Sequence, residues 1–218
     1  MNFLKSLEER DIKKPTTFVS ILTIKKLINS GLNLEGLNLY IDGNTLSLLY
    51  KLKYRKSIKK YNFDMSGIAL EILTSRSEEG PILFFGGTDS DAKLAQEKLR
   101  SLCPKNQSNI IVVNGYERKD YMLGQIERLN PICIILSLGS TYQEEYSLEL
   151  KNIFGSRFQI FTSGAFITQL AKSKEREYYP KWVVTFNIRW IYRCFRERGH
   201  IKRIIDGIFT IPLALKHV

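Results

Sequence analysis

Asp42 is the residue whose type and position could do chemistry most directly. It follows Leu37 to Ile41, a largely apolar stretch that we expect to form a buried strand, and Gly43 comes directly after it. A carboxylate at the end of a buried strand is held rigidly and could act as a general base toward an incoming hydroxyl group. The alternative is that Asp42 only caps the helix that follows. Asp64 is a second carboxylate of this kind, in a less clearly bounded stretch.

Glycines recur where the predicted strands end. They are Gly43, Gly86, Gly87, Gly115, Gly139 and Gly164. Such glycines let a backbone approach a phosphate at a helix N-terminus, although each alone is equally typical of an ordinary turn. The sequence has neither the third glycine of a dinucleotide fingerprint nor a P-loop lysine. Several glycine turns along one sheet edge nevertheless favour a cleft for a nucleotide-like ligand.

Gln143 and Glu144 follow the most apolar stretch of the chain. Residues 132–138 are uncharged and leave no polar face, which predicts a central strand covered on both sides. Gly139 and Ser140 end that strand, and a helical pattern then begins. Ligands of open α/β sheets bind beyond the carboxyl ends of such strands. We therefore expect Gln143 and Glu144 to lie where a ligand binds.

A basic, aromatic stretch forms the end of the chain. The chain carries a net charge of +11, and residues 181–218 hold eight basic residues against two acidic ones. Arg189, Arg193 and Arg196 recur at helical spacing, and three guanidinium groups on one face could chelate a pyrophosphate. The same charge suits an anionic membrane or nucleic acid. A solvated helix docked by its aromatic side chains is the plainer alternative.

Strands and helices alternate along the chain, which predicts an α/β fold with a mostly parallel sheet and helices on both faces. We expect a core over residues 1–175 and a basic C-terminal appendage over residues 176–218, beginning with a long helix. The expected strands are residues 16–20, 37–41, 82–85, 109–113, 132–138 and 157–161.

The three cysteines, Cys103, Cys133 and Cys194, have no metal-ligand spacing and predict buried thiols in a reducing compartment. The first residues do not resemble a signal peptide, and no apolar run is long enough to span a bilayer. We therefore expect a cytosolic protein that uses neither a metal nor another cofactor.

Six motifs, in order and spacing, resemble the WecG/TagA/CpsF glycosyltransferases, family 26 of the glycosyltransferases. They are I-D-G at 41–43, F-F-G-G at 84–87, N-G-Y at 114–116, G-S-T-Y-Q-E at 139–144, S-G-A-F at 163–166, and Y-Y-P-K-W with N-I-R-W-I-Y-R within 178–193. The resemblance covers nearly the whole chain, and the last motif is the most specific.

The resemblance implies a Rossmann-like core with an appendage that touches the cytoplasmic face of the membrane. It also implies metal-independent, inverting transfer of an N-acetylhexosamine or related sugar from a UDP-sugar to an undecaprenyl-diphosphate-linked saccharide. The family's catalytic aspartate falls on Asp42 and its Gln-Glu pair on Gln143 and Glu144, which would hold the nucleotide or sugar. Its appendage arginines fall on Arg189 and Arg193, at the lipid diphosphate. We expect Tyr116, in the N-G-Y motif, to contact substrate.

Two alternatives stay open at this point. A non-catalytic α/β protein could use its basic aromatic helix to bind nucleic acid, although the resemblance argues against a nucleic-acid partner. An inactive family member could bind a lipid-linked sugar without transferring it, because the chain departs from the family pattern at Ser20, Thr141 and His200. The aromatic face of the appendage could also pair two copies of the chain.

Overall fold

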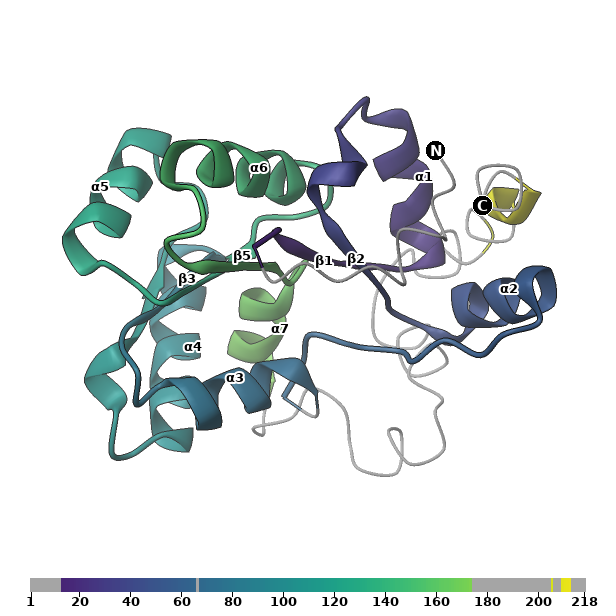
Figure 1. The fold of residues 1–218 in the computed structure, drawn as a ribbon. Coiled ribbons are helices and arrows are strands. Elements are labelled where there is room, and N and C mark those ends of the chain that lie inside the picture. The colour runs from purple at the N-terminus through teal and green to yellow at the C-terminus, as the bar shows by residue number, and fades with distance from the viewer. Residues whose placement is uncertain (1–12, 66, 174–204, 206–208, 213–218) are drawn as a thin grey trace.

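The computed structural model describes residues 13–65, 67–173, 205 and 209–212. At its centre is a six-stranded sheet in which neighbouring strands run parallel, in the order β2-β1-β6-β5-β3-β4 (Figure 1). The strands are β1 (Thr16–Val19), β2 (Asn38–Ile41), β3 (Ile82–Gly86), β4 (Ile110–Val113), β5 (Cys133–Ser137) and β6 (Gln159–Thr162). This arrangement confirms the predicted α/β fold.

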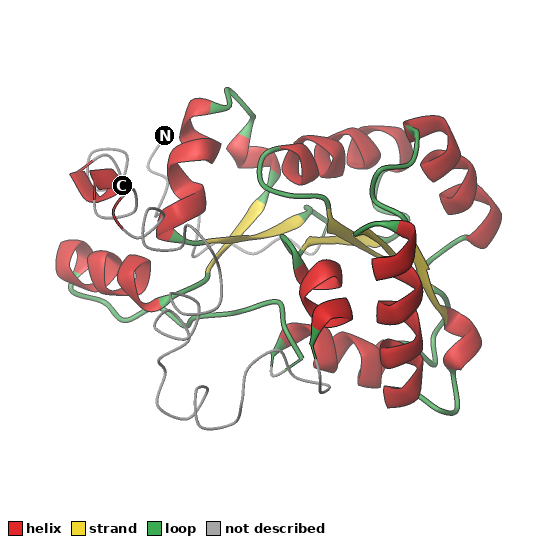
Figure 2. Cartoon of the chain, turned by 180° about the vertical axis from the view of Figure 1, so that it is seen from behind, coloured by secondary structure: helices red, strands yellow, loops and turns green. Residues whose placement is uncertain are grey.

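Helices cover both faces of the sheet. One layer contains α1 (Ile21–Asn29), α5 (Lys119–Leu129) and α6 (Tyr142–Phe154), and the other contains α3 (Ile68–Arg76), α4 (Asp89–Leu102) and α7 (Phe166–Lys172) (Figure 1). Figure 2 shows the sheet between these layers from behind. Helix α2 (Asn44–Tyr54) lies near the β2 edge, and Leu34–Gly36 and Gln107–Asn109 are short 3-10 helices. Helix α7 was not predicted from the sequence.

The neighbouring interior strands β3 and β5 are buried over their whole length. Leu83 and Phe85 pack with residues of α5 and α6, whereas Ile82 and Phe84 pack with α3, α4 and α7. Because helices cover both faces, every position of such a strand must be apolar or small, which explains the uninterrupted apolar sequence. The predicted central position of residues 132–138 is therefore confirmed.

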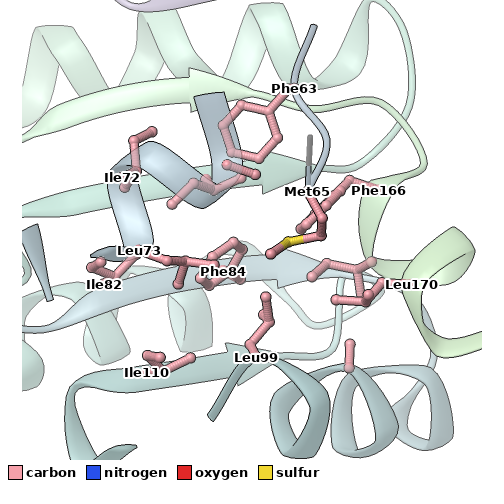
Figure 3. Close-up of a cluster of buried hydrophobic side chains, with 14 of the residues drawn as sticks. Phe63, Met65, Ile72, Leu73, Ile82, Phe84, Leu99, Ile110, Phe166 and Leu170 are labelled. Carbon is pink, nitrogen blue, oxygen red and sulfur yellow. The ribbon is translucent and has the colours of Figure 1, made fainter. Parts of the chain in front are cut away.

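The stretch between α2 and α3 is anchored by Phe63, which lies in the core cluster shown in Figure 3. Its ring packs against Phe18, Phe161 and Phe166, with ring centroids 5.7, 6.2 and 5.3 Å away. Two residues earlier, the Tyr61 N–H donates to the Ile41 carbonyl oxygen at 2.9 Å. The chain after α2 is thus fixed against the carboxyl end of β2 and the face of β1 and β6.

The predicted appendage, residues 176–218, lies outside the described residues except for residues 205 and 209–212. Arg189, Arg193 and Arg196 therefore have no described position. Within the part of the chain that the structure describes, none of the helices has the length and apolar character needed to cross a bilayer.

Candidate active site

The carboxyl ends of all six strands meet at one edge of the sheet, because the strands are parallel. This edge carries Asp42 after β2, Gly86 and Gly87 at the end of β3, Gly115 after β4 and Gly139 after β5. With strands about 4.8 Å apart, Asp42 lies three strands or about 14 Å from the β5 turn, and about 19 Å from the β3 turn. The predicted residues thus share one edge of the sheet, which is long enough for an extended ligand. The Asp42 carboxylate is too far from the turns after β5 and β3 to contact them.

Asp42 is held by the backbone on both sides. Its N–H donates to the Val19 carbonyl oxygen at 2.8 Å, which extends the pairing of β1 and β2 by one residue. Gly43 follows with φ 101° and ψ 158°, a conformation that only glycine adopts readily, and it is the N-cap residue of α2. The half-buried Asp42 therefore stands at the end of a strand directly before a sharp turn, as the sequence predicted.

Asp64 lies near the same end of the sheet. Asp64 is three residues beyond Tyr61, whose N–H is bonded to the Ile41 carbonyl oxygen. Asp64 is therefore at most about 10 Å further from Ile41 than Tyr61 is. The Asn62 side-chain amide donates to its carboxylate, and its carbonyl oxygen accepts the Gly67 N–H at 3.1 Å. The buried neighbours Phe63 and Met65 fix this position. Asp64 could thus serve as a second carboxylate at the Asp42 end of the edge.

The glycines after β3 and β4 are packed against their neighbours. A Cβ atom added at Gly86 would lie 2.5 Å from the Ser137 Cβ atom, and one added at Gly115 would lie 2.8 Å from the Gly86 Cα atom. A Cβ atom at Gly87, which has φ +69°, would lie 2.7 Å from the Asp91 Cβ atom. Close packing of β3, β4 and β5 therefore accounts for Gly86 and Gly115, and packing against α4 together with a positive φ angle accounts for Gly87. The predicted contact of these glycines with substrate stays a prediction.

The N-terminus of α4 carries two carboxylate side chains of its own. Asp89 and Asp91 stand in the first turn, and the Thr88 N–H donates to an Asp91 carboxylate oxygen at 3.3 Å. Carboxylates in the first turn already complement the positive end of the helix. This helix terminus is thus poorly suited to a phosphate.

Gln143 and Glu144 are buried, with 3% and 2% of their surface exposed. One Glu144 carboxylate oxygen accepts hydrogen bonds from the Thr17 hydroxyl at 2.7 Å and from the Gln143 amide at 2.8 Å. Its other oxygen accepts the Thr141 N–H at 2.7 Å, and Gln143 Oε1 accepts the Gly164 N–H at 3.0 Å. The pair therefore ties β1 and the turn after β6 to the turn after β5.

Thr141 is the strained point of that turn. It is β-branched, yet its φ is +72°, a region that such residues rarely adopt. The hydrogen bond from its N–H to Glu144 helps to hold it there. Strain of this kind persists where surrounding contacts fix it, and it is concentrated at functional sites. The Gln143–Glu144 pair thus positions the loop 139–141, and direct contact of the pair with a ligand stays a prediction.

The sequence analysis missed three hydroxyl side chains near this edge. Thr17 and Thr162 lie on adjacent strands with their hydroxyl oxygens 2.6 Å apart. Ser137 donates to the Gly164 carbonyl oxygen at 2.8 Å and accepts the Ile167 N–H at 3.1 Å, which fixes the start of α7. The sequence pattern that could have indicated these residues is a hydroxyl side chain within an otherwise apolar strand.

Tyr116 is 81% exposed and follows the turn after β4. Its N–H donates to the Asn114 side-chain oxygen at 2.8 Å, and the Asn114 amide donates to Asp89 at 3.1 Å. This bonding fixes the backbone and leaves the ring exposed to solvent. The predicted contact of Tyr116 with substrate stays a prediction.

The family comparison decides the class of protein. The model of the glycosyl transferase WecG/TagA/CpsF family matches residues 37–218. The chain belongs to this family. It is also similar to the Bacillus subtilis (strain 168) protein N-acetylglucosaminyldiphosphoundecaprenol N-acetyl-beta-D-mannosaminyltransferase, with 26% identity over 94 residues. That match covers 43% of this chain and 36% of the relative, so it spans about a third of the relative's length.

In this WecG/TagA/CpsF chain, every predicted site residue from Asp42 to Arg196 lies inside the matched region, whereas β1 precedes it. Thr17 therefore joins a strand outside the match to Glu144 inside it. Among the described residues, the structure has no group of His, Cys, Asp and Glu side chains that could hold a metal ion.

Proposed function

We propose that this chain is an inverting, metal-independent glycosyltransferase of cell-surface polysaccharide biosynthesis. It would move an N-acetylhexosamine-type sugar from a UDP-sugar to an undecaprenyl-diphosphate-linked saccharide. One observation carries the proposal: a family match of glycosyltransferases covers residues 37–218, and within it Asp42 is fixed at the carboxyl edge of the sheet. The name of the Bacillus subtilis relative suggests the type of sugar and the lipid diphosphate.

In the proposed mechanism, Asp42 accepts the proton of the acceptor hydroxyl group. The hydroxyl oxygen then forms a bond to the anomeric carbon while the bond from that carbon to the UDP oxygen breaks, with inversion at carbon. UDP departs with the electron pair of the broken bond. The backbone of Asp42 is bonded to β1, and that of the preceding Ile41 is bonded to Tyr61. This fixed position suits the role because general-base catalysis depends on position.

We place the substrates along the turns after β2, β6 and β5. A Cβ atom added at Gly43, Gly139 or Gly164 would meet no atom within 4 Å, so these turns are open, unlike those after β3 and β4. Backbone N–H groups of the loops that Gln143 and Glu144 hold would stabilise the departing diphosphate. This span of about 14 Å leaves room for a donor beside an acceptor at Asp42.

The appendage would hold the lipid end of the acceptor. Arg189, Arg193 and Arg196 would bind the lipid diphosphate, with residues 176–218 against the cytoplasmic face of the membrane and residues 1–175 as the catalytic core. Guanidinium groups bind diphosphate oxygens in pairs, which suits this assignment.

Incubation of the full chain with a panel of UDP-sugars and a lipid-diphosphate saccharide, read by mass, tests the proposal. We expect the acceptor to gain the mass of one N-acetylhexosamine-type residue with release of UDP. Asp42→Asn should abolish most of this gain, and Glu97→Gln, which alters an exposed carboxylate on α4, should leave it unchanged. No mass gain with any donor, from protein that is folded and binds UDP, would contradict transfer and favour an inactive family member.

A further inference from the structure

Helix α2 exposes apolar side chains on the side that faces away from the core. Leu46, Leu49 and Tyr50 are buried against β2 and α1, whereas Leu48 and Leu52 are 56% and 68% exposed. The two exposed leucines are four residues apart and therefore lie side by side on one helix face. The helix thus has a second apolar surface that packing within the described core does not use.

Basic residues accompany and follow these leucines in the chain. Residues 43–63 contain six basic residues, all exposed, and no acidic residue. They are Lys51, Lys53, Arg55, Lys56, Lys59 and Lys60. Together with Leu48 and Leu52 they form what we call the α2 face. Its combination of leucine side chains and a dense positive charge is typical of a surface that lies on an anionic bilayer.

The described residues near the C-terminus pack next to α2. Ile211 packs against the cluster that contains Leu46, Leu49 and Tyr50. Two residues earlier, Phe209 is 77% exposed, and the segment 209–212 lies beside α1 and α2 in Figure 1. A third large apolar side chain is thus exposed at the same end of the molecule.

From these contacts we infer that the α2 face docks on the surface of an anionic lipid bilayer. Leucine side chains enter the boundary between headgroups and acyl chains, and the basic side chains bind lipid phosphates. Nucleic acid would satisfy the charge, but its phosphate backbone offers no apolar environment for the exposed leucine side chains, whereas a bilayer does. The occupant is therefore a membrane rather than a nucleic acid.

This docking would place the candidate active site at the membrane. Leu48 is six residues after Asp42, and four of these residues are helical, so the Cα atoms of Asp42 and Leu48 are at most about 14 Å apart. This consequence rests on the proposed function, in which a lipid-linked diphosphate brings the acceptor. The docking itself does not depend on catalysis and can be measured without it.

The test is co-sedimentation of the full chain with vesicles of phosphatidylcholine alone or with phosphatidylglycerol. We expect binding to the anionic vesicles only. Leu48→Ser with Leu52→Ser should weaken this binding about tenfold, since each buried methylene group contributes to partitioning. Lys51→Gln with Arg55→Gln and Lys56→Gln should weaken it about 100-fold, about fivefold for each charge.

A matched control alters exposed residues of α4 and the loop after it, on another part of the molecule: Leu94→Ser with Lys93→Gln and Lys105→Gln. It should change vesicle binding less than twofold. Wild-type binding by both α2 variants would overturn the inference, as would tighter binding of the full chain to a nucleic-acid duplex than to vesicles. A fall in thermal stability of the leucine variant, with vesicle binding retained, would show that the chain itself covers the face and would also overturn it.

The same samples separate this inference from the proposed function. With a short-chain, water-soluble acceptor, the α2 variants should transfer sugar at the wild-type rate, because none of the changed residues takes part in the chemistry. Vesicle binding by a chain without any transferase activity would reject the proposed function and support the docking. Sugar transfer by the wild-type chain, together with wild-type vesicle binding by the α2 variants, would support the proposed function and reject the docking.

Discussion

The carboxyl edge of the sheet has two parts that use glycine in different ways. After β3 and β4, an added Cβ atom at Gly86 or Gly115 would collide with a neighbouring strand or turn. After β2, β5 and β6, the same atom at Gly43, Gly139 or Gly164 would meet open space. Glycine thus permits close packing in one part, whereas in the other only the positive φ angle requires it. A glycine at the end of a strand does not by itself mark a ligand site.

The charges of the two parts also differ. The packed part places Asp89 and Asp91 at the start of α4, whereas α2, which follows β2 in the open part, has no acidic residue in its first turn. A diphosphate is repelled by the two carboxylates at the start of α4, and the start of α2 carries no such repulsion. The comparison therefore favours the part from β2 to β5 as the substrate side of the edge, with Asp42 at its end.

Glu144→Ala should have the largest effect on stability, because Glu144 joins β1 to the turn after β5. The substitution leaves the Thr17 hydroxyl, the Gln143 amide and the Thr141 N–H without their buried acceptor, and we expect a loss of about 3 kcal/mol or more in the free energy of unfolding. Urea unfolding measures it. The exposed neighbour Glu145→Ala should cost less than about 0.5 kcal/mol, and equal effects would contradict the described network.

Gly86→Ala tests whether the turn after β3 is packed. The added methyl group would lie 2.5 Å from the Ser137 Cβ atom, so we expect a loss of about 1–3 kcal/mol in urea unfolding. Gly124→Ala is the matched control, because Gly124 lies inside α5 with open space around it. That change should increase stability by about 0.5–1 kcal/mol. An increase for both variants would show that the packed part is as open as the rest of the edge.

Cys133, at the start of β5, should make stability fall at alkaline pH. Burial raises the pKa of its thiol from 9.0 to about 12, and nearby Arg76 acts in the opposite direction. Between these values the unfolded chain releases a proton that the folded chain keeps, so stability is complete below about pH 9 and falls as pH rises. We expect about 1 kcal/mol less from about pH 9 to about pH 10. Cys133→Ala should lower stability at every pH but flatten this slope, and parallel pH curves for the two proteins would contradict the burial of the thiol.

Much of the fold could be predicted from local sequence. Residues 132–138 predict a covered strand because they contain no polar face, and the strand, glycine turn and helix over 82–102 are each encoded within a few residues. Helix α7 could not be predicted in this way. It is short, its N-cap residue is Ala165, and the Ile167 N–H is bonded by Ser137, which is 30 residues away. Its start therefore depends on tertiary structure.

The candidate site was predicted in position but not in its connections. Asp42 and the pair Gln143–Glu144 stand at the predicted edge because a parallel sheet gathers its carboxyl ends. The partner of Glu144 is Thr17, 127 residues earlier, and no local pattern relates them. Sequence types therefore identified the polar residues of the edge, and only the structure shows that the Gln143–Glu144 pair holds loops together.

The central claim is that Asp42 accepts the proton of the acceptor hydroxyl group, and its most direct test is the turnover number of Asp42→Asn with saturating UDP-sugar and lipid-linked acceptor. The amide keeps the size of the side chain but is not a base, so we expect turnover to fall by about 100-fold to 10,000-fold. Donor affinity and the free energy of unfolding should stay close to those of the wild type. Turnover within a few-fold of wild type, with the same product, would contradict the account.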